Sequence, residues 1–95
     1  SDELILPVLS VGGRGVISVV ANIMPKETHN LADAFLKGSV DKSRKLQLYL
    51  YDLIKAMFME TNPIPVKESL GLMGLIEPNM RLPLCRMNKD NLAKL

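Results

Sequence analysis

The sequence predicts an α/β fold that is mostly helical, with one strand and about five helices, and that forms the end part of a larger protein. The only convincing strand is residues 15–21, which are apolar at successive positions, as in a parallel strand covered on both faces. Most other segments have the spacing of helices, and no second strand is present. A buried backbone group without a partner costs about 1–3 kcal/mol. Neighbouring strands are therefore expected from outside these 95 residues.

The first predicted element is a short helix before this strand. Ser1 and Asp2 stand at its cap, and helical spacing is shown by Leu4, Ile5, Val8 and Leu9. Gly12 and Gly13 end it in a tight turn that needs a positive φ. A phosphate-binding loop at residues 12–15 is disfavoured, because a dinucleotide fingerprint has its strand before the glycines and its helix after them.

Two longer helices are predicted next. The first begins near Pro25 and ends at Gly38, with a buried face made of Thr28, Leu31, Ala32, Phe35 and Leu36. The second has the strongest periodic pattern of the chain, carried by Leu46, Tyr49, Leu50, Leu53, Ile54, Met57 and Phe58. It ends before Asn62, because Pro63 and Pro65 remove backbone donors and disfavour helix at the residues that precede them.

The last third is predicted as helix, connector and helix. A fourth helix covers about residues 65–73 and is capped by Gly74, and residues 75–87 form an extended connector over an apolar surface. Asn88 caps a final short helix.

Composition and charge exclude several classes of partner. Apolar residues make up 47% of the chain, which indicates a packed interior, and the net charge is only +2 with both signs spread along the sequence. No nucleic acid, membrane, metal or cofactor is indicated. The single cysteine, Cys85, forms no internal disulfide, so a reducing cytoplasmic setting is expected.

Individual polar residues give weak signals. We predict that His29 lies on a helix surface, that Cys85 is a small buried hydrophobe, and that Lys67 caps a helix or forms an ion pair. The basic cluster Lys42, Arg44 and Lys45 is expected on a solvated face. Asn62 is either a turn-forming residue or an amide held in a fixed direction by the stiff Pro-Ile-Pro segment.

Four stretches, in this order, resemble one known family. They are Gly-Gly-Arg-Gly-Val-Ile-Ser-Val at 12–19, Ala-Asn at 21–22 with Pro25, Glu-Thr-Asn-Pro-Ile-Pro-Val-Lys at 60–67, and Arg-Leu-Pro-Leu at 81–84. Together they resemble the C-terminal third of the dihydrodipicolinate synthase and N-acetylneuraminate lyase family of pyruvate-dependent class I aldolases. The resemblance covers essentially the whole chain, and the stretch at 62–67 favours the synthase branch.

The resemblance implies a (β/α)8 barrel, which takes about 250 residues when complete. Residues 1–38 would be its last part, with helix seven, strand eight and helix eight, and residues 39–95 would be a C-terminal helical extension. Strands one to seven would belong to the remainder of the barrel.

The resemblance also implies a function. The complete family member is a lyase, usually a homotetramer, that condenses pyruvate with aspartate 4-semialdehyde through a lysine Schiff base, in lysine and diaminopimelate biosynthesis. No lysine of this chain matches the catalytic one, so the chain alone is expected to be inactive. Ile17 matches a residue of the pyruvate pocket, and Asp2 and Asn62 match residues near the second substrate. Ser1 stands where the family usually has Asp or Asn.

Two readings of other classes stay open. In the first, the chain is a non-catalytic helical module that associates with copies of itself and so buries its strand edges and apolar faces. A helical module that binds nucleic acid or a membrane surface is disfavoured by the balanced charge.

Overall fold

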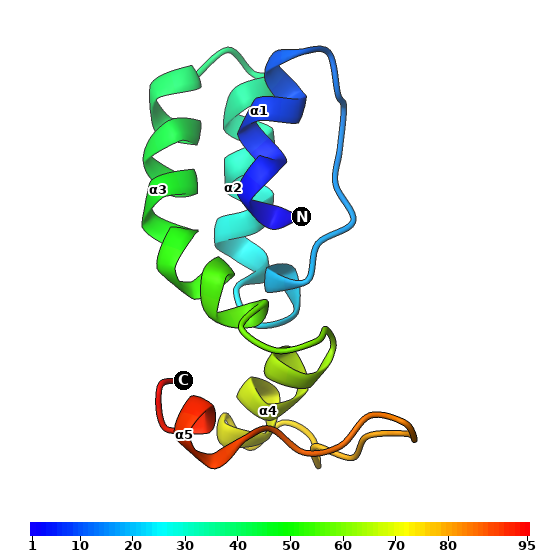
Figure 1. The fold of residues 1–95 in the computed structure, drawn as a ribbon. Helices are drawn as coiled ribbons and strands as arrows, with labels where there is room; N and C mark the ends of the chain where they lie inside the picture. The colour runs from blue at the N-terminus through cyan, green and yellow to red at the C-terminus, as the bar shows by residue number, and fades with distance from the viewer.

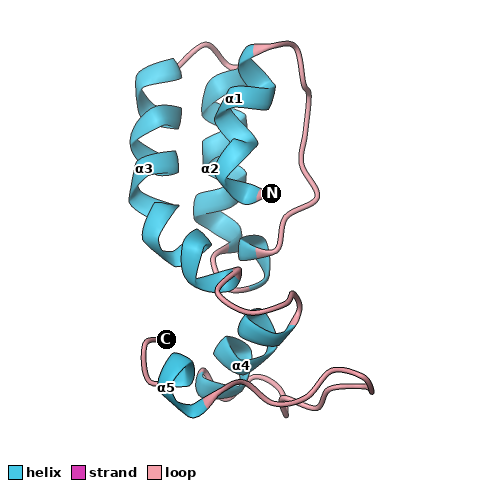
Figure 2. Cartoon of the chain, in the orientation of Figure 1, coloured by secondary structure: helices cyan, strands magenta, loops and turns pink.

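Helices are the only regular elements in the computed structural model, which describes residues 1–95 (Figures 1 and 2). Five α-helices and two 3₁₀ helices follow one another as η1 (Asp2–Leu4), α1 (Ile5–Ser10), η2 (Val20–Asn22), α2 (Pro25–Leu36), α3 (Val40–Met57), α4 (Ile64–Leu72) and α5 (Lys89–Leu92). The helices α1, α2 and α3 lie side by side, and α4 and α5 form a smaller group beyond the end of α3 (Figure 1). The mostly helical character is confirmed.

The predicted strand at residues 15–21 is wrong for this chain. Residues 14–18 are extended but belong to no strand, and Val20 to Asn22 form η2 instead. The amides and carbonyls of residues 14–18 take part in no backbone hydrogen bond. A strand requires a partner that satisfies these groups, and no other segment of the chain runs beside them in that role. The segment is therefore an extended loop along the helices.

A glycine turn ends α1 as predicted. Gly12 has φ +101°, a conformation that favours glycine. The amide of Gly13 donates to the carbonyl of Val8 at 2.9 Å, which closes the turn tightly against the helix. Ser1 stands at the N-cap position of η1, as predicted, but its side chain makes no capping hydrogen bond and the Asp2 carboxylate binds elsewhere.

The close approach at Gly13 gives a first testable prediction. A Cβ at this position would lie 2.5 Å from Val8 Cγ1 and 2.8 Å from the Val8 carbonyl oxygen. We expect Gly13→Ala to lower the free energy of unfolding by about 1–3 kcal/mol, because backbone has to shift. Gly15→Ala is the matched control, since a Cβ there meets no atom within 4 Å. Urea unfolding followed by circular dichroism compares the two, and equal midpoints would contradict the prediction.

The helices α2 and α3 form the main packing layer. Pro25 begins α2 and Gly38, with φ +90°, follows its end, both as predicted. The buried positions of α2 are Thr28, Leu31 and Ala34, whereas Leu36 is exposed, so the predicted face is slightly rotated. The predicted division at residue 38 falls in the turn between α2 and α3 and stays a prediction.

One apolar core joins the first three helices. The buried face of α3 contains two polar residues and three apolar ones, Ser43, Gln47, Leu50, Ile54 and Met57, while Tyr49 and Phe58 of the predicted face are exposed. The buried core residues come from α1, η2, α2 and α3: Ile5, Leu9, Val20, Leu31, Leu50 and Ile54. The N-terminal segment and α3 are thus held together although about 40 residues separate them in the sequence.

The C-terminal group consists of α4, the connector and α5. The prediction of α4 agrees with the structure to within one residue at each end, and Gly74 follows it with φ +77°. Residues 75–87 contain no helix or strand, as predicted, and Pro78 lies against Gly71 of α4. The Asn88 side chain accepts from the Asp90 amide at 2.9 Å, so the predicted cap of α5 is confirmed.

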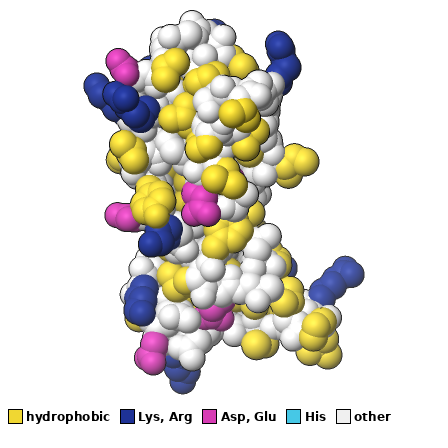
Figure 3. All heavy atoms as spheres, turned by 45° about the horizontal axis from the view of Figure 1, so that its top comes forward, with side chains coloured by type: hydrophobic (Ala, Val, Ile, Leu, Met, Phe, Trp, Pro, Cys, Tyr) yellow, Lys and Arg dark blue, Asp and Glu magenta, His cyan; other side chains and the backbone are white.

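The molecule is elongated and exposes much apolar surface. Its extents are 41 × 22 × 21 Å. Its accessible surface is 6338 Å², compared with about 5,400 Å² for a compact protein of this mass. Hydrophobic side chains are spread over the face of the molecule that Figure 3 shows. The exposed hydrophobic residues of the chain include Val8, Val11, Ile17, Leu48, Tyr49, Leu72 and Leu82. Exposed apolar surface of this extent is typical of a surface that packs against other protein segments or subunits.

Candidate functional site

A buried carboxylate lies at the start of the chain. Asp2 of η1 is 1% exposed, and its Oδ2 accepts the amides of Val19 at 3.1 Å and Val20 at 2.8 Å. These two amides stand at the beginning of η2, where the first turn of a helix has free donors. Oδ1 of the same carboxylate has no hydrogen-bond partner in the chain. Asp2 therefore fixes the end of the extended segment to the N-terminus.

Gln47 connects this arrangement to α3. Its Nε2 donates to the carbonyl of Asp2 at 3.1 Å, and its Oε1 accepts the amide of Leu6 at 3.0 Å. Both polar ends of the amide are thus used, as is required of a side chain that is only 7% exposed. Gln47 holds η1 and the start of α1 in place against α3.

Ile17 lies on the extended segment, two residues before the first of the two amides that Asp2 binds. Its side chain is fully exposed. It lines a small cavity of about 170 Å³ together with residues of η1, α1 and the same segment: Ser1, Leu4, Ile5, Val8, Gly15 and Val16. This cavity is mostly apolar. The structure therefore brings Ile17 and the N-terminal residues together on one face.

Asn62 lies in the turn between α3 and α4 and is exposed. The turn follows the end of the three-helix layer, and α4, which begins two residues later, contacts η2. The elements that follow Ile17 and Asn62 are therefore neighbours in space. The three residues predicted for the site divide into two exposed side chains, Ile17 and Asn62, and one buried carboxylate, Asp2.

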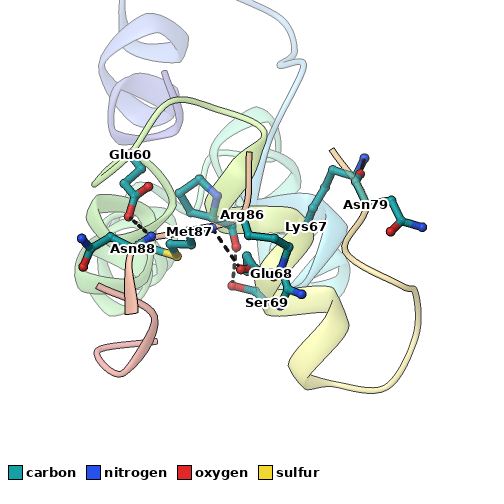
Figure 4. A network of polar contacts seen from close by, with 9 residues as sticks. Glu60, Lys67, Glu68, Ser69, Asn79, Arg86, Met87 and Asn88 are labelled. Atoms are coloured by element: carbon teal, nitrogen blue, oxygen red, sulfur yellow. Dashed lines mark hydrogen bonds and ion pairs between the residues drawn. The ribbon is translucent and has the colours of Figure 1, made fainter. Parts of the chain in front are cut away.

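A second polar network holds the C-terminal connector (Figure 4). Glu68 of α4 is buried, and its two oxygens accept from Arg86 Nε at 2.9 Å and from the Met87 amide at 3.2 Å. Glu60 accepts the amide of Asn88 at 3.1 Å. Lys67 donates to the backbone carbonyl of Asn79 in the connector, so its predicted role in capping a helix or forming an ion pair is wrong. This network is structural, because its contacts hold the connector and the start of α5 against α4 and Glu60.

The other candidate residues are explained by their surroundings. His29 is exposed on α2, as predicted, and the basic cluster on α3 is solvated, with Arg44 paired to Asp41 at 3.0 Å. Cys85 is exposed, so its prediction as a buried hydrophobe is wrong: the apolar connector around it is itself largely exposed. No group of three His, Cys, Asp or Glu residues is placed to hold a metal ion. No helix has the length and apolar character needed to cross a membrane.

The largest cavity, about 480 Å³, lies elsewhere. It is lined by α3, α4, the segment before α2 and the last residues, with Ile23, Met24, Asp52, Leu53, Ala56, Ser69, Leu72, Met73, Lys94 and Leu95. It contains none of the residues that the sequence marks as candidates. Its apolar lining is that of an incompletely filled groove between helices, so we keep the candidate site at the face of Ile17.

Sequence reasoning missed Gln47 and Glu68. Gln47 and Ser43 continue the buried stripe of Leu50, Ile54 and Met57 at alternating spacings of three and four, but a search for apolar periodicity passes over polar members. The signal for Glu68 is weaker, since it stands between Lys67 and Ser69 and only its place in a mostly apolar helix marks it.

Comparison with known proteins gives a consistent result. A model of the dihydrodipicolinate synthetase family matches residues 1–95. The 4-hydroxy-tetrahydrodipicolinate synthase of Caldicellulosiruptor bescii is 54% identical over 91 residues, which are 96% of this chain and 31% of that protein. The enzyme of Clostridium tetani is 50% identical over 95 residues, 100% of this chain and 32% of its own length.

Solved structures agree with these relatives. The dihydrodipicolinate synthase of Aquifex aeolicus has a TM-score of 0.96 at 45% identity, over 99% of this chain and 32% of that one. The enzyme of Thermotoga maritima has a TM-score of 0.95 at 44% identity, over 98% and 32% of the two chains. This chain therefore spans about a third of the length of the proteins that it matches.

Proposed function

Because the chain belongs to the dihydrodipicolinate synthetase family, we propose that it is the C-terminal third of a 4-hydroxy-tetrahydrodipicolinate synthase. The complete enzyme would be a (β/α)8 barrel that condenses pyruvate with aspartate 4-semialdehyde through a lysine Schiff base, in lysine and diaminopimelate biosynthesis. Its proposed compartment is the cytoplasm. The lysine that forms the Schiff base lies outside these residues, and this chain contributes part of the substrate wall and the helical scaffold.

The extended segment at 14–18 is the observation that carries this proposal. Its backbone groups are unpaired on both sides, and Ile17 is fully exposed. In a closed parallel barrel each strand pairs with one neighbour on either side, and side chains near its carboxyl end face the active site. A segment of this kind with both edges open fits strand eight, whose neighbours would be strands one and seven.

The site residues follow from the same placement. Ile17 would line the pyruvate pocket, and the exposed amide of Asn62 would lie in the region of the second substrate. Asp2 belongs to the same region by resemblance, but its carboxylate is buried and binds backbone amides. Its contribution would therefore reach the substrates through the segment that it holds.

Other apolar side chains that are exposed in this chain would be covered in the complete enzyme. Leu4, Val8 and Val16 are exposed around the small cavity and would be covered by the remainder of the barrel. Leu48, Tyr49 and Tyr51 are exposed on α3 and would face another subunit of a homo-oligomer.

A chimeric enzyme tests the proposal. This chain replaces the matching 91 residues of the Caldicellulosiruptor bescii synthase, and condensation is measured with pyruvate and aspartate 4-semialdehyde. We expect the chimera to turn over and the isolated chain to show no turnover, because it lacks the nucleophile. A chimera with native-like circular dichroism but no condensation would contradict the proposal, as would activity of the isolated chain in a sample free of longer polypeptide.

A further inference from the structure

We infer that Asp2 is a positioning residue, which sets the place of Ile17 by holding the end of the extended segment. This inference rests on the proposed function, because it assigns a role within the same substrate wall. The resemblance alone places Asp2 beside the second substrate. The contacts of its carboxylate point to the pyruvate side of the site instead.

One oxygen of the carboxylate is committed to the backbone. A single oxygen, Oδ2, accepts two successive amides, those of Val19 and Val20, and the residue is 1% exposed. Hydrogen bonds from neutral donors to a charged acceptor are stronger than those between neutral groups. This is the only side-chain contact that fixes the end of the segment from a distant part of the sequence, since the Ser18 hydroxyl binds only the nearby Ala21 amide.

The segment itself has no other polar anchor. Residues 14–18 make no backbone hydrogen bond, and Ile17 makes no buried contact that would hold it. Its position within the chain is therefore determined by its two ends, the glycine turn after α1 and the amides bound by Asp2. Ile17 stands two residues from the second of these ends, close enough for a shift of the amides to move its side chain.

Gln47 extends the support into α3. Because Gln47 binds the backbone carbonyl of Asp2 and the amide of Leu6, it fixes the peptide unit from which the carboxylate projects. The path from the helical scaffold to the substrate wall is thus Gln47, Asp2, the amide of Val19 and then Ile17. Supporting groups of this kind determine how well a site is preorganised, and small displacements have large effects on catalysis.

Steady-state kinetics of the chimera test this role. We expect Asp2→Ala to raise the KM for pyruvate by about tenfold, while the KM for aspartate 4-semialdehyde stays within about twofold. Asp2→Asn keeps an oxygen that accepts the two amides and should restore most of the pyruvate affinity. Glu3→Ala is the matched control, because Glu3 is the adjacent, exposed carboxylate of η1. Gln47→Ala should change the pyruvate KM in the same direction by a smaller factor.

The alternatives give different results. A rise in the KM for the semialdehyde alone would overturn the inference in favour of direct contact with the second substrate. Unchanged KM values with a lower active fraction would overturn it in favour of a purely structural role. If Asp2→Ala does not fold, Gln47→Ala decides the question, and a pyruvate KM equal to that of the unsubstituted chimera would refute the inference.

Hydrogen exchange gives a readout that does not depend on activity. The amides of Val19 and Val20 should exchange at least about tenfold faster in folded Asp2→Ala than in the unsubstituted chimera. In Glu3→Ala their exchange should stay unchanged. Unchanged exchange would overturn the inference even if the chimera were active. An inactive chimera with protected amides would count against the proposed function and leave the positioning contact supported.

Discussion

Ile54→Ala is expected to lower the free energy of unfolding by about 2–5 kcal/mol, one of the two largest effects on stability that we predict. Ile54 is 0% exposed and lies in the core cluster with Ile5, Leu9, Val20, Leu31 and Leu50. The substitution removes apolar burial and leaves a cavity in the core that α1, η2, α2 and α3 share. Urea unfolding of the chain, monitored by circular dichroism, measures the loss.

Leu48→Ala is the matched control for this substitution. Leu48 lies on the same helix and is 67% exposed. Its truncation should change the unfolding free energy by no more than about 0.5 kcal/mol in the isolated chain. Equal effects of the two substitutions would contradict the core described here. In the chimera, a larger effect of Leu48→Ala would indicate that a neighbouring subunit covers it.

The helices were predictable because their signals are local. Pro25, Gly38, Gly74 and Asn88 mark helix ends through their own backbone preferences, and each stands where the structure has an end or a cap. The apolar pattern of α3 gave its existence correctly, but its buried face is rotated toward Ser43 and Gln47. Periodicity of apolar residues alone cannot show polar side chains that are buried because they have partners.

The strand and Cys85 show where local signals fail. Residues 15–21 have the composition of a buried parallel strand, but a strand exists only with its neighbours, and this chain supplies none. Cys85 lies in an apolar stretch, yet that stretch forms an exposed connector. The error at Cys85 came from treating an apolar segment as buried, whereas the strand was predicted with neighbours from outside these residues. Burial depends on which other elements are present.

Long-range contacts also limit how much of the candidate site can be predicted from the sequence. Ile17 and Asp2 were found by resemblance alone, whereas Asn62 was also marked by the Pro-Ile-Pro segment that follows it. The hydrogen bonds from Val19 and Val20 to Asp2 join positions 17 and 18 residues apart. The bond from Gln47 joins positions 45 residues apart. Contacts of this range depend on the packing of α1 against α3, and they become visible only in the folded chain.

Glu68→Ala is expected to lower the free energy of unfolding by about 2–4 kcal/mol and to loosen the connector at 75–87. Glu68 is buried, and its removal leaves the buried Met87 amide without an acceptor and Arg86 without its partner (Figure 4). Because Arg86 is 63% exposed, water solvates the released guanidinium, so most of the loss comes from the amide and from the vacated space.

Two comparisons separate these contributions. Glu68→Gln keeps the shape and one acceptor, so its loss should be smaller than that of Glu68→Ala. Glu77→Ala removes an exposed carboxylate of the connector and should have little effect. Urea unfolding gives the free energies, and limited proteolysis reports on the connector directly. We expect cleavage within residues 75–87 to accelerate in Glu68→Ala while α1, α2 and α3 stay intact. If Glu68→Ala and Glu77→Ala behave alike, the buried carboxylate is not what fixes the connector to α4.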